Sequence, residues 1–366
     1  MNIAHVGKKV TWLELFYDLL FVAAVSKVSH VLLHVEHGTI PAVYLFKFIL
    51  IMVPVWWAWV GQSLFVNRYG QDSFSHRIFL ILQLFFSLIM TSSLSVDFDA
   101  YYLSFFIGYV GLRAMTAIQY LSISRREHND RKITAFYLGS RIWIGLGISS
   151  FSLFFDSWIR YAVLFAGIVV DIAFPLLGRR HLGRTSINTY HLIERFALFT
   201  LILLGEIIIS ILGVLQSGPW TWEALIFAVF TFLLAIGIWW QYFDNVEKKV
   251  NKSLQTRGQL IIYGHLIIFM SLSMIAASIR LLFLEQPDYS FIINFMFGSV
   301  FLYFLSTTLV FHKYRPHDER LGIYHLALLM GTLGGLYVLS LLMVVPGYAL
   351  MGGLALFFGL YAKLTT

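Results

Sequence analysis

The feature that most constrains this chain is a series of long apolar stretches separated by short polar connections. A helix needs roughly 20 apolar residues to cross the hydrocarbon core of a bilayer, and twelve stretches approach or exceed that length. They cover residues 11–34, 40–67, 76–96, 99–121, 133–154, 158–177, 188–215, 221–244, 257–284, 290–311, 322–344 and 347–361. Backbone groups in lipid must find hydrogen-bond partners within the protein, so such stretches form helices. The sequence therefore predicts an all-α integral membrane protein with about twelve transmembrane helices.

Composition indicates the same lipid surroundings. Hydrophobic residues occupy 59% of the 366 positions and charged residues only 12%, whereas soluble proteins carry about 25% charged residues. The net charge of +7 does not indicate a nucleic-acid partner, because that function needs basic side chains gathered on one soluble face. The lipid bilayer is therefore the predicted partner. The absence of cysteine excludes disulfides and thiolate-bound metals.

The distribution of basic residues predicts the orientation of the helices. Lysine and arginine mark cytoplasmic loops, because their translocation is disfavoured. Of the 26 basic residues, 19 lie near the two chain ends or beside the connections that follow every second stretch, such as 122–132 and 178–187. The intervening connections carry acids and almost no bases. An even number of crossings with both termini in the cytoplasm explains this alternation.

The chain also matches itself weakly at an offset of 180 residues. The matched pairs include Glu14 with Glu194, Phe16 with Phe196 and Arg77 with Arg257. This offset predicts two repeats of six helices, over residues 1–180 and 188–366. Because six is an even number, the repeats would have parallel topology. Chance similarity between apolar segments is the alternative.

Seven charged side chains are predicted to share one depth inside the membrane, near its cytoplasmic side. A helix rises about 1.5 Å per residue, and this rise brings charges from five helices into the inner third of the bilayer. They are Glu14, Asp18, Arg113, Arg141, Asp171, Glu194 and Arg195. Ionisable groups inside a membrane are costly and usually face the protein interior. We interpret them as a hydrated site for a proton, an ion or a substrate, and salt bridges that only fix helix packing are the alternative for the arginines.

A second polar group is predicted nearer the outer surface. It consists of Lys27, His30, His34, His37 and Glu206. The histidines are spaced i, i+4, i+7, so one helix would present them on one side as ligands for a divalent metal or as a proton sensor. A polar helix end at the membrane surface is the favoured alternative, because one helix seldom supplies a whole metal shell. Lys27 could carry a Schiff-base chromophore, but a lone lysine more often reaches toward water or pairs with an acid, so no cofactor is predicted.

Several motifs resemble landmarks of one known family. The first is the run WLELFYDLLFV from Trp12 to Val22, followed by Ser29 and His30 at the outer end of the same helix. Further motifs are Trp56-Trp57-Ala58-Trp59, Tyr109 with Arg113, and Trp239-Trp240 with Tyr242-Phe243. Together they resemble the bacterial low-temperature-requirement protein A (LtrA) family over nearly the whole chain. The resemblance implies a multi-pass plasma-membrane protein linked to growth in the cold, with no established substrate, and it carries over no catalytic residues.

The leading functional hypothesis is a secondary transporter of an unknown small solute or ion. In this hypothesis Glu14, Asp18 and Glu206 take up and release protons or cations. The arginines of the inner layer balance their charge. An ion channel, a membrane-embedded lipid-modifying enzyme and a non-transporting sensor or scaffold are the alternatives. The sequence has no glycine-rich phosphate loop, H-E-x-x-H or G-x-S-x-G motif, so it indicates no reaction.

Overall fold

The structure is a computed structural model that describes residues 10–71, 73–251, 256–316 and 320–365. Across these ranges the chain is all-α, with 84% helix and no strand. Isolated bridges join Glu36 to Thr39 and Ile187 to Thr256. The described ranges contain thirteen α-helices, of which twelve have 19 residues or more. Each of the twelve overlaps one apolar stretch of the sequence, which confirms the all-α prediction.

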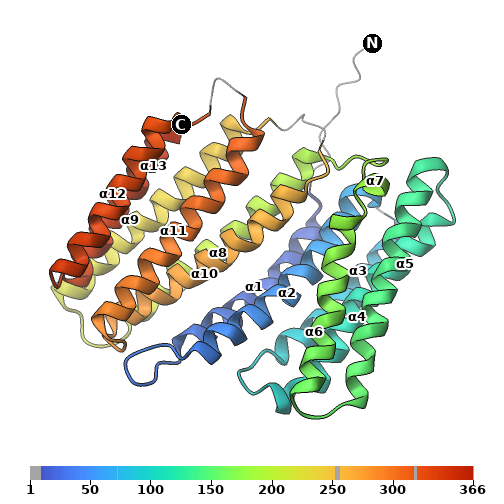
Figure 1. Cartoon of the computed structure of the whole chain (residues 1–366), viewed down its shortest axis with the longest axis horizontal. Helices are drawn as coiled ribbons and strands as arrows, with labels where there is room; N and C mark the ends of the chain where they lie inside the picture. Colours follow the sequence, from blue (N-terminus) through green and yellow to red (C-terminus); the bar gives the residue numbers. More distant parts are fainter. Residues whose placement is uncertain (1–9, 72, 252–255, 317–319, 366) are drawn as a thin grey trace. The chain divides into compact units, whose positions relative to one another are not determined.

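The helices follow one another through short connections (Figure 1). The first seven are α1 (Trp12–His30), α2 (Ala42–Tyr69), α3 (Phe74–Ser92), α4 (Phe98–Ser124), α5 (Asn129–Phe151), α6 (Ser157–Leu177) and the short α7 (Arg179–Leu182). The remaining six are α8 (Thr189–Leu215), α9 (Trp222–Asp244), α10 (Gln259–Phe283), α11 (Tyr289–Tyr314), α12 (Ile323–Leu342) and α13 (Gly347–Thr365). Two 3₁₀ turns, Val31–Leu33 and Ser152–Phe154, extend α1 and α5, and a π-helical turn, Asn245–Lys249, extends α9.

Capping side chains fix where several helices begin. The first N–H groups of a helix have no partner within it, and short polar side chains can accept from them. Ser73, Asp97 and Thr221 each accept a hydrogen bond from the N–H three residues further on. These bonds set the starts of α3, α4 and α9.

Ten of the described helices are long and apolar enough to cross a membrane. The two long helices outside this set are α4 and α5. Helix α4 carries four tyrosines together with Asp99 and Arg113, and α5 begins with the polar run 129–132 and also carries Arg141. The chain is therefore a membrane protein with many spans, and the number of twelve crossings stays a prediction.

The chain divides into two compact units. Unit one consists of residues 1–24, 51–195 and 255–259, and unit two of residues 25–50, 196–254 and 260–366. Helices α1, α2, α8 and α10 contribute residues to both units. The units do not follow the sequence halves 1–180 and 188–366. The internal repeat stays a prediction, because compact packing does not test it.

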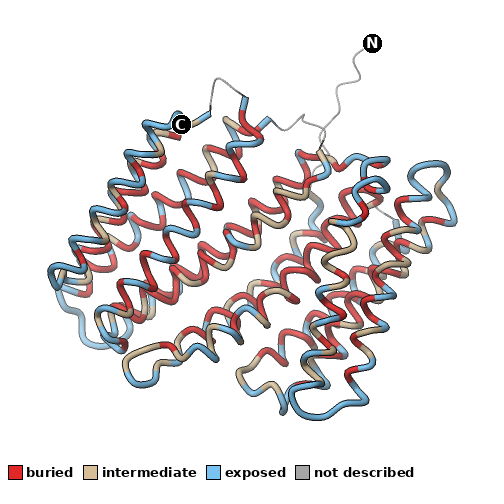
Figure 2. The backbone as a smooth tube through the Cα atoms, in the orientation of Figure 1, coloured by how far each residue is buried: buried red, intermediate tan, exposed pale blue. Residues whose placement is uncertain are grey.

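In unit one, α3, α4, α5 and α6 pack in sequence order, each against the next. The close approach of α3 and α4 depends on Gly108, where an added Cβ would lie 2.4 Å from the backbone nitrogen of Met90. An apolar cluster that includes Phe65, Tyr120 and Leu138 joins α2, α4 and α5. Figure 2 shows buried positions on the facing sides of these helices and exposed positions on the opposite sides.

In unit two, α9 packs against α13, and α12 contacts both α11 and α13. Aromatic rings fill the space between α11 and α13. The ring centroids of Tyr303 and Phe358 lie 5.6 Å apart, and those of Phe304 and Tyr361 lie 5.1 Å apart. Edge-to-face pairs of this kind add to the free energy that burial of large rings provides.

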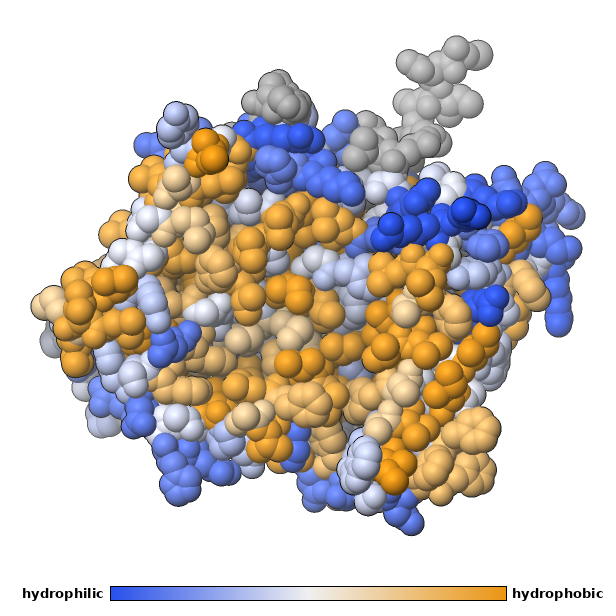
Figure 3. Space-filling view, viewed as in Figure 1, coloured by the Kyte–Doolittle hydropathy of each residue, from blue (hydrophilic) through white to orange (hydrophobic). Residues whose placement is uncertain are grey.

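Large apolar side chains are exposed along the helices of both units. Examples are Ile81 at 53%, Leu103 at 58%, Val169 at 61% and Leu356 at 78% exposure. On the face seen in Figure 3, apolar side chains cover the helices and hydrophilic ones gather near the helix ends. Extended apolar surface of this kind indicates contact with lipid.

Candidate ion-pair site

Unit one contains a buried group of polar side chains, Glu14 and Asp18 on α1 with His191 and Arg195 on α8, termed here the Arg195 cluster. All four residues are at most 3% exposed. Arg195 donates from Nη1 to Oε2 of Glu14 at 2.9 Å and from Nη2 to Oδ1 of Asp18 at 2.6 Å. One guanidinium therefore bridges two carboxylates.

The local sequence explains how these side chains meet. Residues four apart share one face of a helix, which holds for Glu14 with Asp18 and for His191 with Arg195. At the start of α1, Oγ1 of Thr11 donates to Oε1 of Glu14 at 2.9 Å and accepts from the N–H of Glu14 at 3.3 Å. This T-x-x-E pattern is a capping box. It holds one oxygen of Glu14 at the helix start and leaves the other for Arg195.

The hydrogen bonds of Asn67 determine which nitrogen of His191 carries the proton. Nδ2 of Asn67 donates to the carbonyl oxygen of Asn188 at 2.9 Å, and its Oδ1 accepts from the N–H of Asn188 at 3.0 Å. Nδ2 therefore also acts as donor toward Nδ1 of His191, at 3.2 Å. Since Nδ1 accepts, the ring is neutral with its proton on Nε2. That proton points to Oε2 of Glu14, 3.1 Å away.

The Arg195 cluster contains more acid than base. Two carboxylates face one guanidinium and a neutral imidazole, so full ionisation would leave one surplus negative charge. Trp59 donates from Nε1 to Oδ1 of Asp18 at 2.7 Å. Among the described residues, the buried Oδ2 of Asp18 has no hydrogen-bond partner. This oxygen is the open acceptor of the cluster.

A second buried ion pair in unit one joins α4 to α6. Arg113 donates from Nε to Oδ2 and from Nη2 to Oδ1 of Asp171, at 2.8 and 2.9 Å. Trp57 donates from Nε1 to Oδ2 of the same carboxylate at 2.9 Å. Two parallel bonds between a guanidinium and a carboxylate form a strong, oriented pair. This pair is balanced in charge, unlike the Arg195 cluster.

The seven inner charges predicted from the sequence thus form two groups and two single residues. Arg141 and Glu194 belong to neither group. The half-buried guanidinium of Arg141 lies over the rings of Tyr137 and Phe174, at 5.5 and 5.3 Å from their centroids. Glu194 is partly buried, and its Oε2 has no hydrogen-bond partner in the described part of the chain.

The outer histidines do not share a helix face. Helix α1 ends at His30, a 3₁₀ turn follows, His34 has extended backbone with φ −82° and ψ 107°, and His37 has φ 49°. Beyond His30 the chain is not α-helical, so the spacing i, i+4, i+7 does not place the three histidines on one side of a helix. His34 instead stacks on Tyr44, with 4.7 Å between ring centroids. Within the described ranges, no group of three or more His, Cys, Asp or Glu side chains is placed to hold a metal ion, which corrects the expectation of a three-histidine site.

Glu206 and Lys27 of the predicted outer group lie in unit two. Glu206 is 4% exposed. Lys27 is exposed.

Three residues in or beside the Arg195 cluster were not predicted from the sequence. They are His191, Trp59 and Asn67. The spacing of four between His191 and Arg195 could have indicated the histidine. No local pattern indicates the other two, because they lie on α2 and reach the cluster only through helix packing.

An uncharged polar group occupies another part of the interior of unit one. Gln83 on α3 donates from Nε2 to Oε1 of Gln62 on α2 and to Oε1 of Gln119 on α4, both at 2.9 Å. All three glutamines are at most 3% exposed. Amide pairs of this kind hold helices together in lipid without a buried charge.

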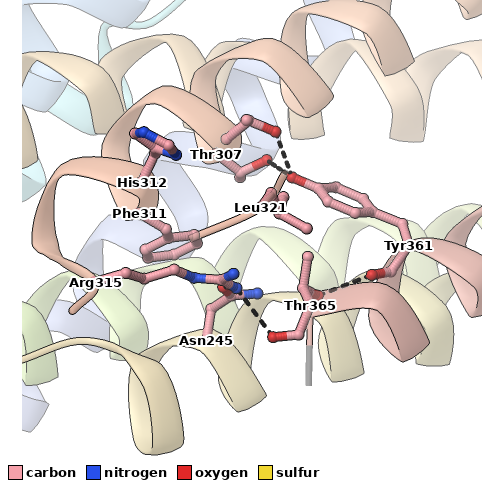
Figure 4. Close-up of a pocket in the computed structure, with 9 residues that line it drawn as sticks. Asn245, Thr307, Phe311, His312, Arg315, Leu321, Tyr361 and Thr365 are labelled. Carbon is pink, nitrogen blue, oxygen red and sulfur yellow. Dashed lines mark hydrogen bonds between the residues drawn. The ribbon is translucent and has the colours of Figure 1, made fainter. Parts of the chain in front are cut away.

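Unit two has a small pocket near the ends of α9, α11 and α13 (Figure 4). Arg315 donates from Nη2 to Oδ1 of Asn245 and, at 3.0 Å, to the carbonyl oxygen of Thr365. The hydroxyl of Tyr361 lies 3.1 Å from Oγ1 of Thr307 and 2.8 Å from Oγ1 of Thr308. These bonds join the ends of the three helices.

Apolar outer surfaces and buried ion pairs on α1, α4, α6 and α8 define a polytopic α-helical membrane protein with a charged interior. The chain belongs to the bacterial low temperature requirement A protein (LtrA) family, whose family model matches residues 9–359. The resemblance seen in the sequence motifs is thereby confirmed.

A relative from Rhizobium meliloti (strain 1021), described as an uncharacterized protein, is 29% identical over 276 residues. The match covers 70% of this chain and 66% of that relative, just under two thirds of its length. No solved structure matches the chain.

Proposed function

We propose that this protein is a proton-coupled secondary transporter of a small solute, in which the Arg195 cluster binds and releases the coupling proton. One observation carries the proposal. Glu14 and Asp18 share the single guanidinium of Arg195, and the imidazole of His191 beside them is neutral.

The surplus negative charge requires a partner, because an unpaired charge buried among membrane helices is costly. A proton needs only one free oxygen, and Oδ2 of Asp18 is such an atom among the described residues. Oxygen ligation of a metal cation needs several ligands around it. The cluster therefore suits a proton better than a metal cation.

Protonation of Asp18 changes the forces between α1 and α8. With Asp18 neutral, Arg195 pairs with Glu14 alone, and the attraction between Asp18 and Arg195 across 2.6 Å weakens. A local charge change that biases two arrangements of packed helices is a common basis of switching. In the proposed transporter, this change links proton binding to helix movement.

The cellular setting forms part of the proposal. We propose a plasma-membrane location with both termini in the cytoplasm, because 19 of the 26 basic residues lie on that side of the expected spans. The proposed cycle moves a proton and a solute and involves no covalent chemistry.

The substitution Asp18→Asn tests the proton site. Asparagine keeps the shape of aspartate and still accepts from Trp59 and Arg195, and it leaves Glu14 and Arg195 as a balanced pair, so the variant should fold. Infrared difference spectra of the purified protein across a pH titration should show a protonated carboxyl group in the wild type that is missing in the variant.

A transport assay completes this test. Liposomes containing the protein and a pH-sensitive dye are exposed to a panel of amino acids, sugars and organic acids. Proton movement that accompanies one of these solutes should occur with the wild type and with the control Glu223→Gln, whose side chain is exposed at the start of α9. It should be lost in Asp18→Asn. Solute-linked proton flux that survives Asp18→Asn, or no titrating carboxyl group in the wild type, would show the proposal to be wrong.

A further inference from the structure

Unit one contains a second polar site, whose chemistry differs from that of the proposed proton site. It is a narrow pocket between α2, α4, α5 and α6 that opens at the surface, with a cavity volume of about 30 Å³. The polar side chains that line it are Arg113, Arg141 and Asp171.

The pocket carries one surplus positive charge. Arg113 and Asp171 neutralise each other through two hydrogen bonds. Arg141 makes no ion pair or hydrogen bond with any described residue, and its contacts are the faces of Tyr137 and Phe174. A half-buried guanidinium without a carboxylate inside a membrane protein indicates that an anion completes the site.

Arg113 also offers a free donor to the pocket. Asp171 occupies Nε and Nη2 of Arg113, and the remaining Nη1 has no hydrogen-bond partner among the described residues. Arg113 is only 2% exposed. A buried N–H group without an acceptor costs free energy, so a ligand oxygen at Nη1 would relieve that cost.

The rest of the lining is aromatic and apolar, and includes Trp57, Tyr120, Phe174 and Pro175. Such walls favour a ligand with an apolar body beside its charged group. They disfavour a strongly hydrated ion such as phosphate, whose hydration the walls cannot replace, and a single-atom ion such as chloride would leave the apolar wall uncovered.

We propose that this pocket binds a small organic monocarboxylate, with its carboxylate between Arg141 and Nη1 of Arg113 and its apolar part against the aromatic wall. One surplus guanidinium matches one negative charge, and the planar fork of arginine matches a carboxylate. The inference names a substrate class for the transporter and in that respect rests on the proposed function. One proton on Asp18 and one carboxylate in the pocket would move together without net charge.

Equilibrium dialysis of the purified full-length protein in neutral detergent tests the site directly. The probes are radiolabelled acetate, isovalerate and benzoate, which share the carboxylate and differ in apolar body. Saturable binding of at least one is expected. Benzamide, which has the shape of benzoate without its charge, should not compete, and neither should chloride at the same concentration.

Arginine substitutions locate the binding. Arg141→Gln should weaken binding by about ten- to hundredfold, the loss expected for a charge-assisted contact. Arg141→Lys keeps the charge but loses the planar guanidinium, so its affinity for the acid should lie between those of the wild type and Arg141→Gln. The matched control is Arg160→Gln, because Arg160 also lies over an aromatic ring, that of Tyr102, but pairs with Asp156. Gel filtration and melting temperature confirm that each variant is folded, which is expected since Arg141 makes no hydrogen bond with any described residue.

The outcomes separate the two proposals. Absence of saturable binding for all three acids would overturn the pocket proposal, as would equal binding by Arg141→Gln and Arg160→Gln or full competition by benzamide. Asp18→Asn should bind the acid as the wild type does at fixed pH while losing coupled proton flux. Binding without any flux would therefore refute the proposed function alone, and flux without carboxylate binding would refute the pocket alone.

Discussion

An added Cβ at Gly61 of α2 would lie 1.8 Å from Nη1 of Arg113 and 3.1 Å from its Cζ. The guanidinium cannot simply turn away, because Asp171 holds it through two hydrogen bonds. Glycine at position 61 is therefore needed for the close approach of Arg113 to α2. Any larger residue would force the buried ion pair to shift.

The substitution Gly61→Ala should lower stability by about 1–3 kcal/mol, the usual cost of forcing extra atoms into a packed interior. The matched control is Gly147→Ala on α5, where an added Cβ would meet nothing within 4 Å. That change should be neutral or stabilise by up to about 1 kcal/mol, because alanine favours a helix over glycine. Melting temperatures in detergent would compare the two, and equal values would contradict the packing argument.

The residues of the candidate site were partly predictable. A spacing of four residues placed Glu14 and Asp18 on one helix face, and the structure agrees. Their partner could not be predicted, because depth in the membrane is similar for Arg113, Arg141 and Arg195. Only the packing of α8 against α1 selects Arg195, and that packing depends on contacts between residues more than 170 positions apart.

At the scale of helices, apolar length predicted each long element because a helix in lipid must be apolar over its whole span. One exception is the outer end of the first stretch, predicted to continue to residue 34. The α-helix ends at His30, and the chain turns at His37 and Gly38, both with positive φ of 49° and 74°. Hydropathy reports where a segment lies, but it does not distinguish an α-helix from a 3₁₀ turn. For that reason the sequence could not show that the helical spacing of the histidines ends at His30.

The connection between α4 and α5 is held by an ion pair that should respond to pH. Arg131 donates to both carboxylate oxygens of Glu127, from Nη2 at 2.7 Å and from Nε at 2.9 Å, and also donates to the carbonyl oxygen of Arg68 at 3.2 Å. These hydrogen bonds hold the pKa of Glu127 below its ordinary value. Because the pKa of Glu127 is lowered, the ion pair stabilises the connection fully above the pKa of a free glutamate, roughly 4.3. This stabilisation is lost as the pH falls through the lowered pKa of Glu127 in the folded protein.

Hydrogen exchange of the backbone amides in residues 125–131 measures this effect. After correction for intrinsic rates, acidification should speed exchange by about 1.4- to fivefold, because exposed pairs contribute about 0.2–1 kcal/mol. Glu127→Gln should show the faster exchange already at neutral pH and little further change on acidification. The connection 216–221, which has no acid of its own, serves as an internal control. A pH response in Glu127→Gln as large as in the wild type would assign the effect to another group.

For the whole molecule, compactness and repetition are different properties. Helices α1, α2, α8 and α10 each contribute residues to both compact units, whereas the predicted repeat concerns the order of helices along the chain. A repeat can therefore exist across units that do not follow the sequence halves. The sequence predicted a membrane protein because each apolar stretch can be recognised from its own residues. It could not predict the compact units, because they depend on which helices contact one another.

The orientation of the spans is testable because the chain has no cysteine, so a single introduced cysteine reports one position without background. Four exposed positions in connections or at a helix start suit this purpose: Ala100, Arg126, Ser186 and Gly218. The alternation of basic residues predicts that cysteines at 100 and 218 face the outside and that those at 126 and 186 face the cytoplasm.

An impermeant maleimide added to intact cells should therefore label Ala100→Cys and Gly218→Cys, and should label Arg126→Cys and Ser186→Cys only after the membrane is opened. The pair at 100 and 126 decides between twelve and ten crossings, because α4 lies between them and is less apolar than the ten helices that meet the criteria for a span. If α4 and α5 cross, the two cysteines lie on opposite sides. If they do not, position 126 is labelled from the same side as position 100, while positions 186 and 218 are unchanged, because removing two crossings restores the orientation of everything that follows. Labelling of position 186 from outside would contradict both arrangements, since neither the twelve-crossing nor the ten-crossing chain can produce it.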